Sequence, residues 1–104
     1  MVNVNESYYS ALAACAERYL NMIKVAIDDN DYWGWSKSTF ERSQAFDLMI
    51  FIGEFQREIQ NRMPLNKLNR WLGYIQGTLI AWGKTTVNEE RDWTRPLFRP
   101  LDYT

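Results

Sequence analysis

The sequence contains no histidine and a single cysteine, Cys15, among its 104 residues. A Ser–His or Cys–His nucleophile pair is therefore excluded, and so is a zinc site with four Cys and His ligands. One thiol cannot form a disulfide framework within the chain. Because Cys15 lies among alanines on an apolar helical face, we interpret it as a small core residue. The sequence also lacks a glycine-rich phosphate loop.

Long apolar runs are absent as well. The most apolar stretch, residues 44–55, is interrupted by Asp47 and Glu54 and is shorter than the roughly 20 residues that a bilayer requires. Residues 1–6 lack the basic and apolar regions of a signal peptide. The net charge of −1 favours neither nucleic acid nor membrane for the molecule as a whole. We therefore expect a cytoplasmic protein without a cofactor or a metal.

Apolar residues recur at helical spacing over most of the chain, which predicts one all-α domain over residues 1–104. Pro96 and Pro100 should stop a final helix, because proline removes a backbone donor and clashes with the preceding turn. The expected architecture is a bundle of three main helices at about 6–28, 39–62 and 66–82, a short helix at about 87–94, and an extended C-terminal arm over residues 95–104.

The predicted helix 39–62 organises the rest of the chain. Ser38 and Glu41 form a capping box at its start, and Pro64 ends it. Two apolar rows lie side by side on it, where most surface helices have one; the rows are Phe46, Met49, Ile50 and Gly53, and Leu48, Ile52, Phe55 and Ile59. We therefore predict a central helix that is covered by its neighbours or by a second copy of the chain.

Gly73 and Gly77 lie on one face of the helix at 66–82. Each glycine costs about 1 kcal/mol relative to alanine in a helix. Two of them on one face therefore indicate close contact with another backbone or with a bulky ring. This face is a second candidate for a homodimer contact.

The loop before the central helix contains Trp33 and Trp35 on either side of Gly34. A tryptophan side chain can bury roughly 150–250 Å², so both rings are costly to leave in water. Two interpretations remain open. The rings fold back to cap the core, or they form an exposed anchor for another chain.

The last third of the chain resembles small uncharacterised proteins of tailed bacteriophages. The resemblance is carried by an N-R-W-x-G-x-x-Q-G helix and the T-T-V-x-E turn that follows it, here Asn69–Gly77 and Thr85–Glu89, with Thr94-Arg95-Pro96 after them. It implies a phage or prophage origin and a location in the host cytoplasm. It implies no chemistry, but small phage proteins of this size often bind and inhibit or redirect a host protein.

Three functions are compatible with the sequence. Carboxylates at Asp47, Glu54 and Glu58 share one side of a helix and could line a small-molecule or weakly enzymatic site, although Arg57 and Arg62 are placed to neutralise them. Basic residues and tryptophans in the last third could bind nucleic acid as an accessory surface.

We favour the third function, a non-enzymatic helical module that binds a host protein such as a defence complex. Arginine and tryptophan, which dominate binding hot spots, are concentrated in the last third of the chain. The predicted partner-binding residues are Trp33, Trp35, Arg70, Tyr74, Arg91, Trp93, Arg95 and Phe98. No catalytic or metal-binding residue is predicted.

Overall fold

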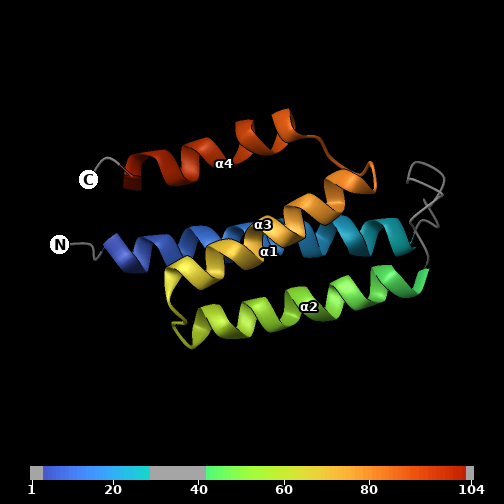
Figure 1. Ribbon diagram of the computed structural model, residues 1–104, viewed down its shortest axis with the longest axis horizontal. Coiled ribbons are helices and arrows are strands. Elements are labelled where there is room, and N and C mark those ends of the chain that lie inside the picture. The colour runs from blue at the N-terminus through green and yellow to red at the C-terminus, as the bar shows by residue number, and fades with distance from the viewer. Residues whose placement is uncertain (1–3, 29–41, 103–104) are drawn as a thin grey trace.

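The computed structural model describes residues 4–28 and 42–102 (Figure 1). These residues form helices and the turns between them, which confirms the prediction of an all-α chain. The elements are α1 (Val4–Asp28), α2 (Arg42–Gln60), α3 (Leu65–Ala81) and α4 (Val87–Asp102). Within the described ranges, no helix is long and apolar enough to cross a membrane.

The centre of the bundle is α1, not α2 as predicted. Helix α1 packs against α2, α3 and α4, whereas the main contacts of α2 are with α1 and α3. Helix α1 is rich in small residues and buries a broad arc of its surface. The buried residues include Leu12, Cys15, Ala16, Tyr19 and Ile23. Small residues let neighbouring helices approach closely.

Only one of the two apolar rows of α2 is in the core. Leu48, Ile52, Phe55 and Ile59 are all buried. In the other row, Phe46 and Ile50 are exposed, and Met49 and Gly53 are half-buried. In the described part of the chain, neighbouring helices therefore cover one row of the two, and cover of the second row by another copy of the chain stays a prediction. A four-helix arrangement centred on α1 leaves no helix to cover the second row.

The ends of α3 match the predicted helix within one residue. Gly83 follows α3 with a φ of 76°, a conformation that glycine adopts without strain. The Gly83 N–H donates to the Ile80 carbonyl at 2.9 Å, and the Lys84 N–H donates to the Leu79 carbonyl at 2.9 Å. These two bonds form the Schellman motif that the sequence position of the glycine indicates.

The turn between α2 and α3 is attached to the start of α1. Arg62 occupies the left-handed position after α2, with a φ of 61°. Its guanidinium forms an ion pair with Glu6 at 2.6 Å and lies 4.9 Å from the centre of the Tyr9 ring. The Tyr9 hydroxyl donates to the Met63 carbonyl at 2.8 Å. The hydrogen bonds from Arg62 also lower the pKa of the Glu6 carboxyl.

The structure of the C-terminal residues differs most from the sequence-based prediction. A short helix at 87–94 and an extended arm were expected, but α4 continues through Pro96 and Pro100 to Asp102. Both prolines are exposed, so water can reach the backbone carbonyls that lack an N–H partner. On the opposite side, Trp93, Leu97 and Phe98 pack against the core. Tertiary burial of this apolar face therefore outweighs the low helix propensity of proline.

The start of α4 has half of a capping box. The Glu89 N–H donates to the Thr86 hydroxyl oxygen at 3.1 Å, as a helix N-cap requires. The Glu89 carboxylate instead lies 3.1 Å from the Thr85 hydroxyl oxygen, whose proton is donated to Glu90. The capping box predicted at Ser38 and Glu41 lies outside the described residues.

Candidate binding surface and buried polar network

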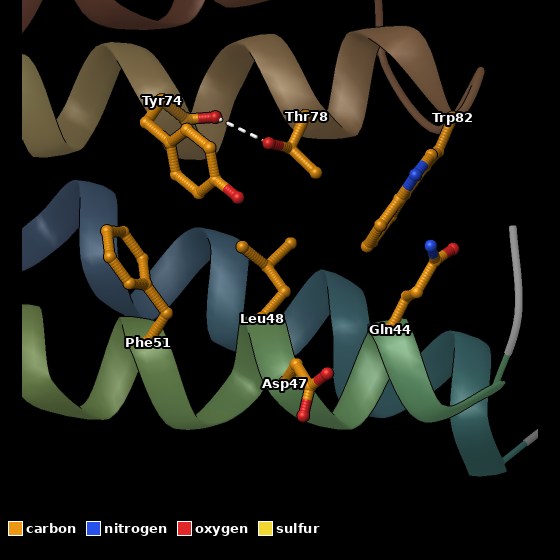
Figure 2. A pocket seen from close by; sticks show the side chains of 7 residues that line it. All are labelled: Gln44, Asp47, Leu48, Phe51, Tyr74, Thr78 and Trp82. Atoms are coloured by element: carbon orange, nitrogen blue, oxygen red, sulfur yellow. Dashed lines mark hydrogen bonds between the residues drawn. The ribbon is translucent and has the colours of Figure 1, made fainter. Parts of the chain in front are cut away.

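A groove of about 320 Å³ lies between α2 and α3. Figure 2 shows its apolar walls, with side chains from both helices facing the same space. The residues that line it are Gln44, Asp47, Leu48, Phe51, Tyr74, Thr78 and Trp82. Asp47 lies at the α2 edge and is exposed. An exposed carboxylate is hydrated by water and needs no buried partner.

Aromatic rings form one wall of this groove. The Phe51 ring stacks on Trp71 with centroids 5.1 Å apart and meets Tyr74 edge-on at 5.0 Å. Tyr74 nevertheless remains 59% exposed. The groove therefore has a fixed aromatic wall with a large accessible face, which is a suitable geometry for receiving a side chain of another protein.

The uncovered apolar row of α2 lies on the face of the helix away from the groove, because none of its residues lines the groove; we call Phe46, Met49, Ile50 and Gly53 the outer row. Ile50 is 61% exposed and Phe46 is 38% exposed. An added Cβ at Gly53 would meet no atom within 4 Å, so no internal contact requires a glycine there. The outer row is thus an apolar strip that folding leaves accessible.

Gly73 and Gly77 are open in the same way. An added Cβ at either position would meet no atom within 4 Å. The predicted close contact with a backbone or a ring is therefore wrong within the described part of the chain. Whether a second copy covers this face stays a prediction.

The carboxylates of Asp47, Glu54 and Glu58 form no ion pair with any residue in the described ranges. The predicted neutralisation by Arg62 is wrong, because Arg62 binds Glu6 on α1 instead. Arg57 is exposed and likewise forms no ion pair with a described residue. The three carboxylates are therefore an uncompensated acidic edge beside the α2–α3 groove.

The predicted partner-binding residues that the structure describes lie on two helices, α3 and α4. Arg70 and Tyr74 are exposed on α3, and Arg91 and Arg95 are exposed on α4. Two other residues on α4 are half-buried. The Arg18 guanidinium lies 4.8 Å from the Trp93 ring centre, and Phe98 is 6.0 Å from Tyr8. Trp33 and Trp35 lie outside the described residues.

The tryptophans of the last third are largely taken up by packing. Trp82 is 7% exposed, and Trp71 and Trp93 are half-buried. Nucleic-acid binding by stacking requires accessible aromatic faces next to basic residues. The described surface of α3 and α4 offers arginines without exposed tryptophans, and its exposed aromatic ring is Tyr74; nucleic-acid binding stays a prediction.

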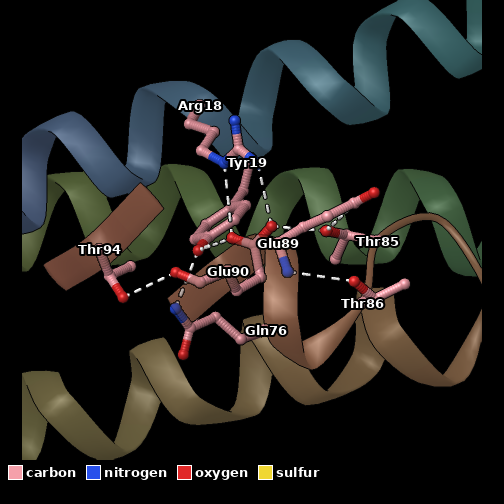
Figure 3. A network of polar contacts seen from close by, with 8 residues as sticks. All are labelled: Arg18, Tyr19, Gln76, Thr85, Thr86, Glu89, Glu90 and Thr94. Carbon is pink, nitrogen blue, oxygen red and sulfur yellow. Dashed lines mark hydrogen bonds and ion pairs between the residues drawn. The ribbon is translucent and has the colours of Figure 1, made fainter. Parts of the chain in front are cut away.

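A buried polar network joins α4 to α1 and α3 (Figure 3). At its centre is Glu90, which is 4% exposed. Its carboxylate accepts from Arg18 Nη2 at 3.0 Å, from the Thr85 hydroxyl at 2.5 Å and from the Tyr19 hydroxyl. Gln76 Nε2 in turn donates to the Tyr19 oxygen at 2.9 Å. Helix α1 and the α3–α4 turn therefore contact this carboxylate directly, and α3 joins the network through Tyr19.

The electrostatics of the network keep Glu90 ionised. Burial by itself raises the pKa of Glu90, but hydrogen bonds from Arg18, Thr85 and Tyr19 outweigh burial and lower it. Burial and the hydrogen bond to Glu90 raise the pKa of the Tyr19 hydroxyl. The bond to Glu90 also raises the pKa of Arg18. The ionised Glu90 carboxylate and its three donors therefore form a buried polar network that attaches α4 to α1.

Sequence reasoning did not identify this network. Glu90 reads as an ordinary acid in the first turn of a helix, and Tyr19 reads as one member of an apolar row. The available signal was the resemblance itself, since Gln76, Thr85, Thr86 and Glu89 carry it and all lie in or beside the network. These motif residues help to attach α4 to the rest of the bundle.

Cys15 should be unreactive in the folded protein. It is fully buried, and burial together with the charge of Glu90 raises its pKa to about 12. Because the thiolate is the reactive form, we expect a disulfide reagent at pH 8 to modify the native protein at least about 100-fold more slowly than the urea-unfolded protein. A native rate close to that of the unfolded chain would contradict the burial of this thiol.

Comparison with family models, curated proteins and solved structures found no match to this chain. Within residues 4–28 and 42–102, no group of three or more His, Cys, Asp or Glu side chains is placed to hold a metal ion. Function is therefore inferred from the chemistry of the chain's own surfaces.

Proposed function

We propose that this chain is a non-enzymatic binding protein whose partner is another protein. Its candidate contact surfaces are the outer row of α2 and the α2–α3 groove, which lie on different faces of α2. The observation that carries the proposal is the exposure of three large apolar side chains on these two helices, which are Phe46, Ile50 and Tyr74. Scattered single apolar residues are normal on a protein surface, but an exposed apolar row along one helix face favours an interaction site.

Apolar side chains that folding leaves exposed can still gain free energy when a partner buries them. Fully burying an isoleucine or phenylalanine side chain contributes about 1.5–3 kcal/mol, and folding leaves most of this unrealised at Ile50. A partner that covers the outer row would gain this energy. Tyr74 and Phe51 add a rigid aromatic wall, which loses little conformational entropy when a partner docks.

The resemblance of the last third to tailed-phage proteins supports a host protein as the partner. In this proposal, the chain acts in the cytoplasm of an infected cell as a stoichiometric inhibitor or adaptor, for example of a defence complex. Arg70 is exposed one helical turn before Tyr74 and would add a charged contact at the edge of the groove.

Affinity capture from host lysate, with nuclease treatment, tests this proposal. We expect Phe46→Ser combined with Ile50→Lys to reduce capture of a stoichiometric partner at least about 10-fold, because buried apolar anchors dominate interface energy. The matched control is Val25→Lys on α1, since Val25 is 55% exposed but lies outside the outer row. Equal capture by both variants, with folding verified by circular dichroism, would refute the assigned surface.

A further inference from the structure

The groove between α2 and α3 combines apolar side chains with one accessible ring and one accessible carboxylate. Leu48, which is 4% exposed, points into it, and the half-buried Phe51 ring forms part of its wall (Figure 2). Tyr74 from α3 and Asp47 from α2 line the same groove and are both exposed. A group that enters between the two helices therefore meets apolar atoms, an aromatic face and a carboxylate together.

Two polar groups of this groove can only accept hydrogen bonds from a ligand. The Asp47 carboxylate has no proton to donate when it is ionised. The Thr78 hydroxyl donates its proton to the Tyr74 carbonyl at 2.7 Å, as Figure 2 shows, so its oxygen is left with lone pairs alone. None of the described residues that line the groove is a lysine or an arginine. The groove therefore suits a ligand that brings N–H donors and a positive charge.

The described charges around the groove are consistent with this preference. On α2, Glu54 is a second exposed acid on the same side of the helix as Asp47. On α3, Arg70 precedes Tyr74 by one helical turn, whereas Thr78 follows Tyr74 by one turn. Arg70 and Thr78 are therefore about 12 Å apart along the helix axis, and Arg70 does not line the groove.

We propose that the α2–α3 groove binds an arginine side chain of the protein partner. The methylene groups of that arginine lie on Leu48 and Phe51, and its guanidinium lies between the Tyr74 ring and the Asp47 carboxylate. Arginine fits better than lysine, because a planar guanidinium stacks on a ring while its N–H groups bind a carboxylate. This inference rests on the proposed function, since it names the chemical group that the partner presents at one of the two candidate surfaces.

The attraction does not depend on one exposed ion pair. Such a pair contributes little by itself, because water and salt screen it. Here the same guanidinium is also attracted to the face of an aromatic ring, and its methylene groups cover apolar surface. Together these three contributions should give a short arginine-containing peptide a Kd of about 1–10 mM. In the complete interface they select for a partner with arginine at this position.

Two short peptides test the proposal on the pure full-length chain. One is acetyl-Leu-Arg-Leu-amide, and the other carries citrulline in place of arginine, which replaces the guanidinium by a neutral group of the same shape. Each is titrated into isotope-labelled protein and followed by NMR. The arginine peptide should shift the backbone amide signals of Asp47, Tyr74 and Thr78, and it should bind about 3–10-fold more tightly than the citrulline peptide.

Three variants assign the effect to individual groups. Asp47→Asn keeps the shape of the side chain but removes its charge, so it should weaken the arginine peptide and leave the citrulline peptide unchanged. Tyr74→Leu should also weaken the arginine peptide more than the citrulline peptide, because it removes the ring face. Glu54→Gln is the matched control, since it removes an exposed charge of α2 that does not line the groove. It should change the binding of either peptide less than about 1.5-fold.

Four results would overturn the proposal: equal binding of the two peptides, arginine-peptide binding that Asp47→Asn leaves unchanged, signal changes confined to another face, or no signal change up to about 20 mM peptide. The titration contains no host protein and does not involve the outer row. A failed titration therefore leaves the capture experiment with the Phe46 and Ile50 substitutions interpretable, and a failed capture leaves the arginine site measurable on the pure chain.

Discussion

Replacing Glu90 by glutamine should lower the free energy of unfolding by about 2–4 kcal/mol at pH 7. Removal of one partner from a buried ion pair usually costs about 3–5 kcal/mol, because the other charge is left buried and unpaired. The expected loss is smaller here, since the Arg18 side chain is 27% exposed and can be partly hydrated. The measurement is urea unfolding followed by circular dichroism.

The pH dependence of this effect identifies its origin. Because the pKa of Glu90 is lowered by folding, its contribution to stability is present above the ordinary carboxyl value of 4.5 and is lost as the pH falls through the folded-state value. The difference in unfolding free energy between wild type and Glu90→Gln should therefore be constant near pH 7. It should shrink in acid below pH 4.5.

Two further variants make the Glu90 experiment decisive. Glu89→Gln changes an exposed neighbour of Glu90 and should cost much less. Adding Arg18→Gln to Glu90→Gln should cost less than the sum of the two single changes, because the double variant leaves no unpaired charge. Additive losses, or an equal loss at position 89, would show that the network does not stabilise α4 in the way described.

Replacing Pro96 by alanine should raise the free energy of unfolding by about 1–3 kcal/mol. Proline in a helix interior is about 3 kcal/mol less favourable than alanine. Proline also restricts the unfolded chain, and losing this restriction in the alanine variant offsets part of the gain in stability. Pro96 lies within α4 and is exposed, so the substitution removes no core contact. Alanine also restores an N–H that can donate to the carbonyl four residues earlier. Chemical unfolding measures this change.

The sign of this effect distinguishes the two structures considered for the C-terminus. If residues 95–102 formed an extended arm, Pro96→Ala would add freedom to the unfolded chain without any helical gain, and stability would fall slightly. Pro64→Ala is the matched control, because Pro64 precedes α3, where proline is well tolerated. An increase at position 96 together with no gain at position 64 would establish the continuous helix.

The candidate surface was only partly predictable from the sequence. Tyr74 was predicted as a contact residue, and it is exposed beside the groove. Phe46 and Ile50 were identified as apolar, but helical periodicity cannot say which of two apolar rows finds a partner within the chain. That choice depends on how many helices surround α2, which is a property of the assembled bundle.

By itself, the sequence determined the helical class and the ends of α3. It did so through local effects, namely the spacing of apolar residues and the left-handed backbone of Gly83. Three features were decided only by tertiary structure: the central place of α1, the continuation of α4 through its prolines, and the burial of Glu90. Each depends on groups far apart in the sequence. The apolar face of α4 overcomes the prolines because it packs against the core, and Glu90 is stable in the interior because Arg18 and Tyr19, about 70 residues earlier, supply its partners.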